Sequence, residues 1–304
     1  MNDSMTARLM DVKRFAVHDG PGIRTTLFLK GCSLRCVWCH NPEGISAALQ
    51  LAYYAHKCIS CGECAAVCPQ GAHSMTDGLH RFERARCRAC GQCVPGCLGE
   101  ALQLFGRSIT VEEAAGMALE DRVFYEQSGG GVTLSGGEPL LQADFCAALA
   151  EKLRAEHIAT AIDTCGCVPW DAFEKLLPLA EIFLFDVKQI DPDAHKRLTG
   201  QDNRLILENL RRLSSAGARI EIRMPLVPGA NDDEATLQGI GRFLQPLSIE
   251  KMRVLPYHSM ARSKYAALGL RDTMPDVPSP DDAAIERAVR ILQSYHVPAV
   301  SGKA

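Results

Sequence analysis

The 304-residue sequence predicts an α/β protein: an open barrel of strand–helix units that carries a small inserted domain. Three observations predict this fold. From about residue 131 onward, short apolar runs alternate with longer amphipathic segments, which is typical of parallel strands joined by crossover helices. One isolated apolar run precedes that region. Between the two lies a stretch in which cysteine, glycine and charged residues replace the apolar runs.

The predicted strands are short and rich in β-branched and aromatic residues. In chain order they are Thr25–Lys30, Gly131–Ser135, Ala159–Asp163, Ile182–Val187, Arg219–Leu226 and Lys251–Tyr257. Apolar residues recur with a period of about 3.6 in the predicted helices, which are Asp144–His157, Trp170–Leu179, Arg204–Ala216, Asp233–Leu244 and, after a proline-rich linker at Asp272–Asp282, Ala283–Tyr295. Six units are too few for a closed barrel, so we expect a partial (β/α)6 TIM-like barrel.

The change of composition between roughly Ala52 and Gln103 sets the domain boundaries. No long helix or strand is legible there, so something other than an apolar core must hold this stretch together. We therefore predict a barrel formed by residues 1–51 and 104–304 and an inserted domain of residues 52–103.

Composition and charge exclude several classes of protein. The chain has 33 Lys and Arg against 36 Asp and Glu, and its basic residues are dispersed, which argues against a nucleic-acid partner. A charged fraction of 23% with 47% hydrophobic residues excludes a disordered chain. No stretch approaches the roughly 18–20 apolar residues of a membrane span, and the N-terminus has no apolar signal core. We expect a cytoplasmic protein without a membrane partner.

The 14 cysteines are the unusual feature of the composition, and eleven of them lie between Cys32 and Cys97. Thiols stay reduced in the cytosol, so an excess of cysteines there indicates metal or redox chemistry rather than disulfides. A disulfide framework would also have no reason to leave the following two hundred or so residues nearly empty of cysteine.

The predicted insert contains the spacing C-x2-C-x2-C-x3-C twice, at Cys58, Cys61, Cys64 and Cys68 and again at Cys87, Cys90, Cys93 and Cys97. This is the spacing of bacterial ferredoxins, in which three thiolates hold one 4Fe–4S cube and the fourth crosses to the other cube. We therefore assign Cys97 to the first run and Cys68 to the second. Structural zinc sites also use C-x2-C pairs, but two matched quartets favour a ferredoxin-like insert with two clusters.

A third set, Cys32, Cys36 and Cys39, has only three cysteines, spaced C-x3-C-x2-C directly after the first predicted strand. Three thiolates leave one iron of a 4Fe–4S cube without a protein ligand, and catalytic metals use such an open position to bind substrate. His40 could complete a zinc knuckle instead. Since a directly adjacent residue can hardly span the cube, we expect His40 beside the cluster rather than on it.

This cysteine loop after the first strand of a partial barrel resembles the radical S-adenosylmethionine (SAM) enzymes. The segment His18–Arg24 (HDGPGIR), the Cys39-His-Asn-Pro sequence and the ferredoxin-like insert resemble, more closely, the glycyl radical enzyme activating enzymes. The resemblance runs from about Asp11 to His258. It implies that Cys32, Cys36 and Cys39 hold a catalytic cluster that reductively cleaves SAM, and that the resulting 5′-deoxyadenosyl radical takes a hydrogen atom from a backbone glycine of a partner glycyl radical enzyme.

The resemblance also implies which residues recognise the amino group of SAM. Ser135–Pro139 (SGGEP) follows a predicted strand, at the end where α/β sheets bind their ligands. Glycines permit close backbone approach, and a carboxylate can pair with an ammonium group. By the resemblance, Gly136, Gly137 and Glu138 recognise the methionyl amino group.

Further implied SAM contacts lie at the ends of the following predicted strands. Asp163, Thr164 and Asp186 would hold a monovalent cation beside the methionyl carboxylate, and Lys188 would pair with that carboxylate. Arg223 would contact the carboxylate or the ribose, and His258 the nucleoside. Without the resemblance, Asp163 would be interpreted as a helix cap and Lys188 as a solvated rim residue.

Three cysteines remain without an assigned function. Cys165 stands where the family commonly has asparagine, and a thiol so near a radical site is unexpected. Cys146 and Cys167 lack ligand spacing and are interpreted as packed thiols.

The sequence leaves three functions open. The leading hypothesis is an activating enzyme with three 4Fe–4S clusters and SAM, acting as a monomer on a glycyl radical enzyme, with a ferredoxin or flavodoxin as electron donor. In that hypothesis His18–Arg24 contacts the partner, and the insert either relays electrons or shapes the docking surface. The alternatives are a radical SAM enzyme that acts directly on a small metabolite or peptide, and a ferredoxin-like electron carrier.

Overall fold

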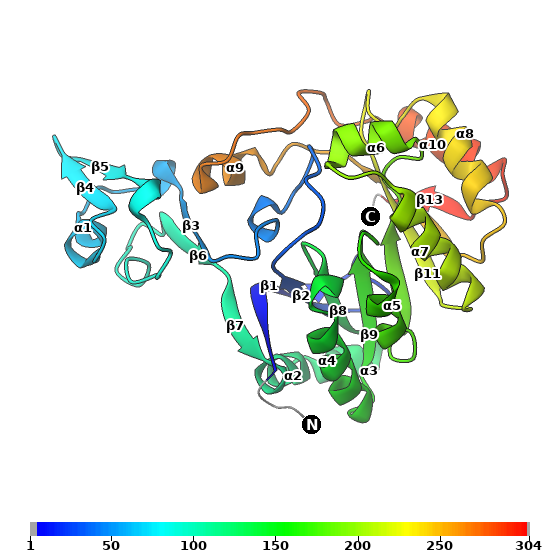
Figure 1. Cartoon of the computed structure of the whole chain (residues 1–304), viewed down its shortest axis with the longest axis horizontal. Coiled ribbons are helices and arrows are strands. Elements are labelled where there is room, and N and C mark those ends of the chain that lie inside the picture. Colours follow the sequence, from blue (N-terminus) through cyan, green and yellow to red (C-terminus); the bar gives the residue numbers. More distant parts are fainter. Residues whose placement is uncertain (1–4, 303–304) are drawn as a thin grey trace.

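A mostly parallel nine-stranded sheet forms the body of the protein in the computed structural model, which describes residues 5–302 (Figure 1). Its strands, in the order in which they lie side by side, are β13 (Ala299–Ser301), β12 (Lys251–Pro256), β11 (Ile220–Leu226), β10 (Ile182–Asp186), β9 (Ala159–Thr164), β8 (Gly131–Gly136), β2 (Arg24–Leu29), β1 (Thr6–Ala16) and β7 (Arg107–Thr110). Residues 1–4 and 303–304, the extreme ends of the predicted barrel and part of the N-terminus predicted to lack a signal core, lie outside the described residues.

The six predicted strands are confirmed, and each runs parallel to the next from β2 to β12. The short β13 adds a seventh parallel strand, while β1 and β7 join antiparallel beyond β2. β13 and β7 are the two edges, so within residues 5–302 the barrel is open. We did not predict β1, in which the exposed residues Thr6, Arg8, Asp11, Lys13 and Phe15 alternate irregularly with more buried ones.

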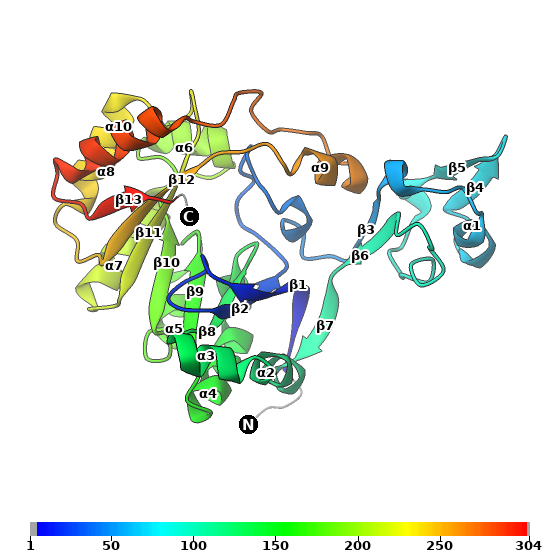
Figure 2. The same ribbon diagram turned by 180° about the vertical axis from the view of Figure 1, so that it is seen from behind.

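Helices cover the outer face of the parallel strands (Figure 2). They are α2 (Val111–Leu119), α3 (Arg122–Ser128), α4 (Ala143–Ala155), α5 (Trp170–Leu176), α7 (Arg204–Ser215), α8 (Glu234–Leu244) and α10 (Asp282–Gln293). Helix α6 (Pro192–Thr199) lies beside the cysteine loop, where the amides of Arg35 and Val37 donate to its carbonyls. The predicted helices are confirmed, with α8 and α10 starting after aspartates that cap the first turn. None of the helices among residues 5–302 has the length and apolar character needed to cross a bilayer.

The cysteine-rich segment projects from one side of this body (Figures 1 and 2). It contains β3 (Gln50–Tyr53), α1 (Glu63–Val67), β4 (His73–Thr76), β5 (Leu79–Phe82) and β6 (Leu102–Phe105). β3 pairs with β6, and this pairing sets Ala52 opposite Gln103. Arg84 links the segment to helix α9 (Arg262–Leu268) by donating to the carbonyl oxygens of Leu51 at 2.6 Å and Ala267 at 2.7 Å.

The end of β8 packs tightly against the segment that leads from β2 into the cysteine loop. The amide of Gly137 donates to the carbonyl of Leu29 at 2.9 Å, and that of Glu138 to the carbonyl of Gly31 at 2.7 Å. A Cβ on Gly136 would lie 2.1 Å from the Leu29 oxygen, and one on Gly137 would lie 2.2 Å from the Gly31 oxygen. Both glycines are therefore required by the packing of one backbone on another, which is a different reason from the ligand approach expected from the sequence.

Replacing Gly136 with alanine should destabilise the protein by at least about 2 kcal/mol, because its φ of +130° is strained for any side chain and the new Cβ clashes. Gly116→Ala is the matched control. Gly116 lies in helix α2 with open space around its Cβ position, so its substitution should stabilise by up to about 1 kcal/mol. Urea unfolding of the two variants measures both effects, and equal stabilities would contradict the packing argument.

Candidate active site

A cleft of about 530 Å³ lies at the carboxyl ends of the parallel strands. This volume is in the range that holds cofactor-sized molecules. Residues from the ends of β8, β9 and β10 line the cleft together with the cysteine loop: Ser135, Gly136, Gly137, Asp163, Thr164, Cys165, Asp186, Lys188, Cys32, Cys36 and Cys39. The structure thus brings the three-cysteine motif and most of the predicted SAM residues to one cavity.

The cysteine loop is held by contacts with the C-terminal part of the chain. The amide of Cys39 donates to the carbonyl of Cys36 at 3.1 Å, and the hydroxyl of Tyr265 donates to the carbonyl of Cys39 at 3.0 Å. Burial raises the pKa of the Cys36 thiol to about 12 and that of Cys39 to about 11. Thiolates so buried need compensating positive charge, which iron supplies, so the three cysteines fit a metal cluster that opens onto the cleft.

The ring of His40 contacts His258. Its Nε2 lies 2.8 Å from the carbonyl oxygen of His258, and the two rings stack with centroids 3.9 Å apart. Lys264 holds the same segment by donating to the carbonyl of His40 at 3.1 Å and to the carboxylate of Glu43. This arrangement places His40 beside the cysteine loop, and His258 on the wall of the cleft. We did not single out Lys264 or Glu43 from the sequence.

Glu138 is fully buried and does not line the cleft. Its carboxylate accepts from the hydroxyl of Thr164 at 2.8 and 2.9 Å and from the amides of Leu140 at 3.1 Å and Cys165 at 2.8 Å. Burial raises the pKa of Glu138, while these hydrogen bonds oppose that shift. In this structure the carboxylate thus joins the ends of β8 and β9. From the sequence we had instead expected it to face the ammonium group of SAM.

The acidic residues of the cleft are paired with basic ones. Lys188 donates to Asp186 at 2.5 Å, and although burial lowers the pKa of Lys188, the neighbouring acidic groups, with Asp186 foremost among them, together raise it. Asp163 accepts from Ser135 at 2.6 Å and from Arg223 at 3.4 Å, and burial raises its pKa while Arg223 opposes the shift. Each of these two carboxylates thus has a cationic partner in the protein, and the monovalent cation expected beside them stays a prediction.

Arg223 lies behind Asp163 and is not part of the cleft lining. It is 8% exposed and also donates to the carbonyl of His18 at 2.5 Å. His18 and Asp19 line the cleft, and the hydroxyl of Thr26 donates to the Asp19 carboxylate at 2.8 Å. The start of the HDGPGIR segment therefore forms part of the cleft wall.

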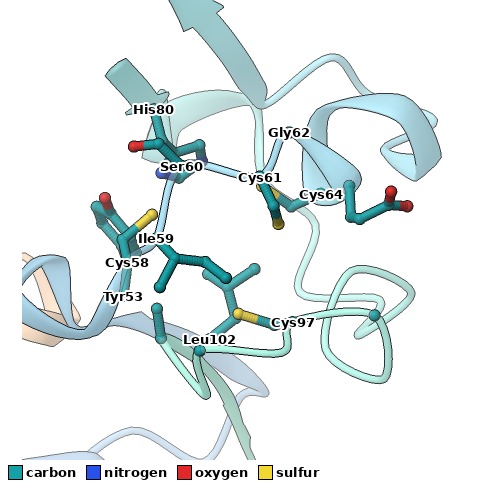
Figure 3. Close-up of a pocket in the computed structure, with 14 residues that line it drawn as sticks. Tyr53, Cys58, Ile59, Ser60, Cys61, Gly62, Cys64, His80, Cys97 and Leu102 are labelled. Atoms are coloured by element: carbon teal, nitrogen blue, oxygen red, sulfur yellow. The ribbon is translucent and has the colours of Figure 1, made fainter. Parts of the chain in front are cut away.

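The eight cysteines of the projecting segment lie in two groups. One pocket is lined by Cys58, Cys61, Cys64 and Cys97, and a second by Cys68, Cys87, Cys90 and Cys93. Figure 3 shows the first, with Cys58 and Cys61 on the chain that leads into α1, Cys64 in α1 itself and Cys97 on a separate loop. Each group takes three cysteines from one run and one from the other, which is the exchange that the ferredoxin spacing predicts.

Two histidines line these pockets, His80 the first and His73 the second, and we did not single them out from the sequence. Nδ1 of His73 lies 2.9 Å from Nε2 of His80. One nitrogen of each ring and the sulfur of Cys64 all lie within 4.8 Å of one another. Burial lowers the pKa of His73 to about 4, so its ring is neutral at physiological pH. The pair lies beside the thiols on the short hairpin of β4 and β5. These two strands are too short to show a periodic pattern in the sequence, so the sequence did not predict them.

Comparison with known proteins agrees with the site. The sequence profile of the Radical SAM superfamily matches residues 26–238. A radical SAM methyltransferase from Sphaerobacter thermophilus superposes with a TM-score of 0.54 at 17% identity, covering 99% of this chain and 74% of that one, which shows the same fold. The fold and the three-cysteine cleft thus define a radical SAM protein.

Two relatives that align over almost the whole chain identify the family within this superfamily. It is 39% identical to the (2S)-3-sulfopropanediol dehydratase activating enzyme of Klebsiella oxytoca, over 97% of this chain and 95% of that one. It is 40% identical to the choline trimethylamine-lyase activating enzyme of Oleidesulfovibrio alaskensis, over 96% of both chains. The chain belongs to the radical SAM superfamily and, within it, to the glycyl radical enzyme activating enzymes.

Glu138→Ala should destabilise the protein by about 3 kcal/mol, because the buried amides of Leu140 and Cys165 and the hydroxyl of Thr164 lose their acceptor. Glu126→Ala, on the exposed face of α3, is the control and should change stability by less than about 0.5 kcal/mol. Thermal and chemical unfolding of the cluster-free proteins would reveal the difference. A Glu138 variant as stable as the control would show that the carboxylate does not join the strand ends.

Proposed function

We propose that this enzyme cleaves SAM reductively and removes a hydrogen atom from a backbone glycine of a partner glycyl radical enzyme. The observation that carries the proposal is the meeting of Cys32, Cys36 and Cys39 at one end of a cleft of about 530 Å³. Three thiols leave one iron of a 4Fe–4S cluster open. The relatives, all named as activating enzymes, support the choice of a protein partner.

Cys32, Cys36 and Cys39 would hold a 4Fe–4S cluster, which would supply the electron for reductive cleavage of the C5′–S bond of SAM and so for the proposed removal of the glycine hydrogen by the 5′-deoxyadenosyl group. The chain's own residues bind and orient the reactants. Lys188, charged and held at the cleft wall by Asp186, is placed to pair with the methionyl carboxylate. Gly136 and Gly137 offer backbone groups on the same wall for the methionyl amino group.

The stacked rings of His40 and His258 are proposed to bind the nucleoside. Both residues line the cleft, as does Tyr257, whose ring centroid lies 6.4 Å from that of His40. Arg223 acts indirectly in this arrangement, because it fixes Asp163 and the carbonyl of His18 from behind the wall. Glu138 likewise acts by holding the turn that carries Thr164 and Cys165.

The partner's glycine must reach the cleft, and His18 and Asp19 are the proposed contacts for it. Both line the cavity, on the segment that precedes β2. Once a peptide segment fills the cleft it excludes water, which protects a reactive radical from side reactions.

Residues 52–103 are proposed to form an inserted ferredoxin-like domain, with residues 1–51 and 104–304 forming the barrel. The two pockets of four cysteines support two further 4Fe–4S clusters, one on Cys58, Cys61, Cys64 and Cys97 and one on Cys68, Cys87, Cys90 and Cys93. A ferredoxin or flavodoxin is the proposed electron donor. We further expect the enzyme to act as a monomer in the cytoplasm.

Anaerobic incubation of the reconstituted enzyme with SAM, a reductant and candidate glycyl radical enzymes tests the function. We expect 5′-deoxyadenosine and, with the correct partner, a glycyl doublet in the electron paramagnetic resonance (EPR) spectrum. Cys36→Ala should reduce both to background, since a cluster ligand is lost. Cys146→Ala, a buried thiol that contacts the carbonyl of Pro139, should retain both. Absence of 5′-deoxyadenosine from the fully loaded enzyme would refute SAM cleavage, and 5′-deoxyadenosine formed only with a small metabolite would refute the activating function.

Replacing one ligand in each insert pocket, Cys61→Ala or Cys90→Ala, tests whether the insert carries electrons. If it does, turnover with a ferredoxin or flavodoxin should fall severalfold, while turnover with a strong artificial reductant changes little, because that reductant reaches the catalytic cluster directly. Iron and sulfide analysis of each variant should show the loss of one cluster. An equal loss of turnover with both reductants would count against a relay.

A further inference from the structure

Helix α9 lies between the projecting segment and the body of the protein (Figures 1 and 2). On one side, Ala267 shares a buried apolar cluster with Phe105 of β6. On the other side, Tyr265 shares a second buried cluster with Trp38 of the cysteine loop and Tyr257 of the cleft wall. Because apolar packing holds α9 from both sides, a polar side chain on this helix can fix a neighbouring segment of the chain.

Lys264 of α9 holds the segment that follows the last cysteine of the loop. Its ammonium group donates to the carbonyl of His40 at 3.1 Å, to Oδ1 of Asn41 at 3.3 Å and to the carboxylate of Glu43. A lysine ammonium has three N–H donors and no acceptor, so these three partners use its full hydrogen-bonding capacity. One side chain of α9 thus fixes the chain from His40 to Glu43.

A buried charge keeps the Lys264 ammonium at this segment. Glu43 is 4% exposed, and Lys264 is its ion-pair partner. The second carboxylate oxygen of Glu43, Oε2, is buried and has no hydrogen-bond partner within residues 5–302. Because a buried carboxylate without a cation is unfavourable, the pair with Lys264 is difficult to break.

The segment that Lys264 holds carries one of the two stacked rings of the cleft wall. His40 donates from Nε2 to the carbonyl of His258 at 2.8 Å, and the ring centroids are 3.9 Å apart. In the described part of the chain the ring of His258 makes no hydrogen bond of its own, so its stacking on His40 orients it. The placement of both rings therefore depends on the backbone of His40, whose carbonyl Lys264 binds.

We propose that Lys264 is a positioning residue for the nucleoside part of SAM, which it orders through His40 and His258 without touching the ligand. A binding group keeps its productive geometry when neighbouring hydrogen bonds hold it. The inference rests on the proposed function in one respect, the nucleoside contact of the two histidines. It goes beyond that function because it assigns a task to a residue of α9 that does not line the cleft.

The proposed contacts of the methionyl part of SAM are held by other interactions. Lys188 is fixed by its own ion pair on the cleft wall. Gly137 packs against Gly44, whose carbonyl accepts from the amide of Gly31 at 2.8 Å. Loss of the Lys264 ammonium should therefore weaken the binding of the nucleoside and leave that of the amino-acid part unchanged, a pattern that a general loss of stability does not produce.

Equilibrium dialysis of the reconstituted holoenzyme, kept oxidised so that SAM is not cleaved, tests the proposal. Three labelled compounds are compared: SAM, 5′-methylthioadenosine, which lacks the amino-acid part, and methionine, which lacks the nucleoside. Lys264→Met removes the ammonium and keeps an apolar stem. Lys175→Met is the matched control, because it also removes the lysine of an ion pair, here with Asp144 at 2.6 Å between α5 and α4.

In Lys264→Met the dissociation constants of SAM and 5′-methylthioadenosine should rise about tenfold, the effect of one hydrogen bond to a charged group. That of methionine should stay within about twofold of the wild type, as should all three in Lys175→Met. Lys264→Arg, which keeps a positive charge and donors, should restore a large part of the lost affinity. If Lys264→Met does not load its clusters, the double variant Lys264→Met/Glu43→Gln replaces it, since it leaves no unpaired buried charge.

Unchanged binding of 5′-methylthioadenosine without the Lys264 ammonium would overturn the proposal. An equal loss of methionine binding would also overturn it, since that pattern indicates a general disruption of the cleft. Failure of the wild type to bind 5′-methylthioadenosine would overturn both this inference and the nucleoside contact on which it rests. Nucleoside-specific weakening in an enzyme that forms no 5′-deoxyadenosine on reduction would support the inference while refuting SAM cleavage.

Discussion

The buried carboxylate of Glu138 is the interaction on which the site depends. Through its amide it is tied to the carbonyl of Gly31, and through its oxygens to Thr164 and Cys165, so one residue joins the ends of β2, β8 and β9. Gly136 and Gly137 pack so closely on the same segment that no space for a side chain remains between these ends. Because the cysteine loop begins directly after Gly31, its position is set by this junction.

Charge balance is the second constraint on the cleft. The wall carries Asp163 and Asp186, and each is matched by a cation of the protein, Arg223 or Lys188. Buried charges persist only when they are paired in this way. Lys188 also lies close enough to Cys36 and Cys39 to oppose the rise in their pKa, so the same side chain that is proposed to bind the methionyl carboxylate also favours thiolates in the loop.

The projecting segment follows a different physical rule. Its buried apolar cluster consists of little more than Leu51, Cys93 and Leu102, which is too small a core to order some fifty residues. Small domains of this kind need covalent or metal cross-links. The two pockets that each contain four cysteines are the places for such cross-links, and Arg84 anchors the segment to α9. With the two clusters proposed for these pockets, the segment between β3 and β6 would be held together without disturbing the barrel.

Sequence by itself determined the parallel strands, their order and the three cysteine sets, because these features depend on local periodicity and spacing. It also indicated that Gly136, Asp163 and Lys188 would meet at one end of the sheet, since parallel strands share that end. Only the tertiary structure decided the rest. The inward turn of Glu138, the stacking of His40 on His258 and the contact of Cys165 with Ser33 join residues between about 25 and 220 positions apart. No spacing rule encodes such contacts, because they arise from how packed strand ends exclude water and satisfy their buried polar groups.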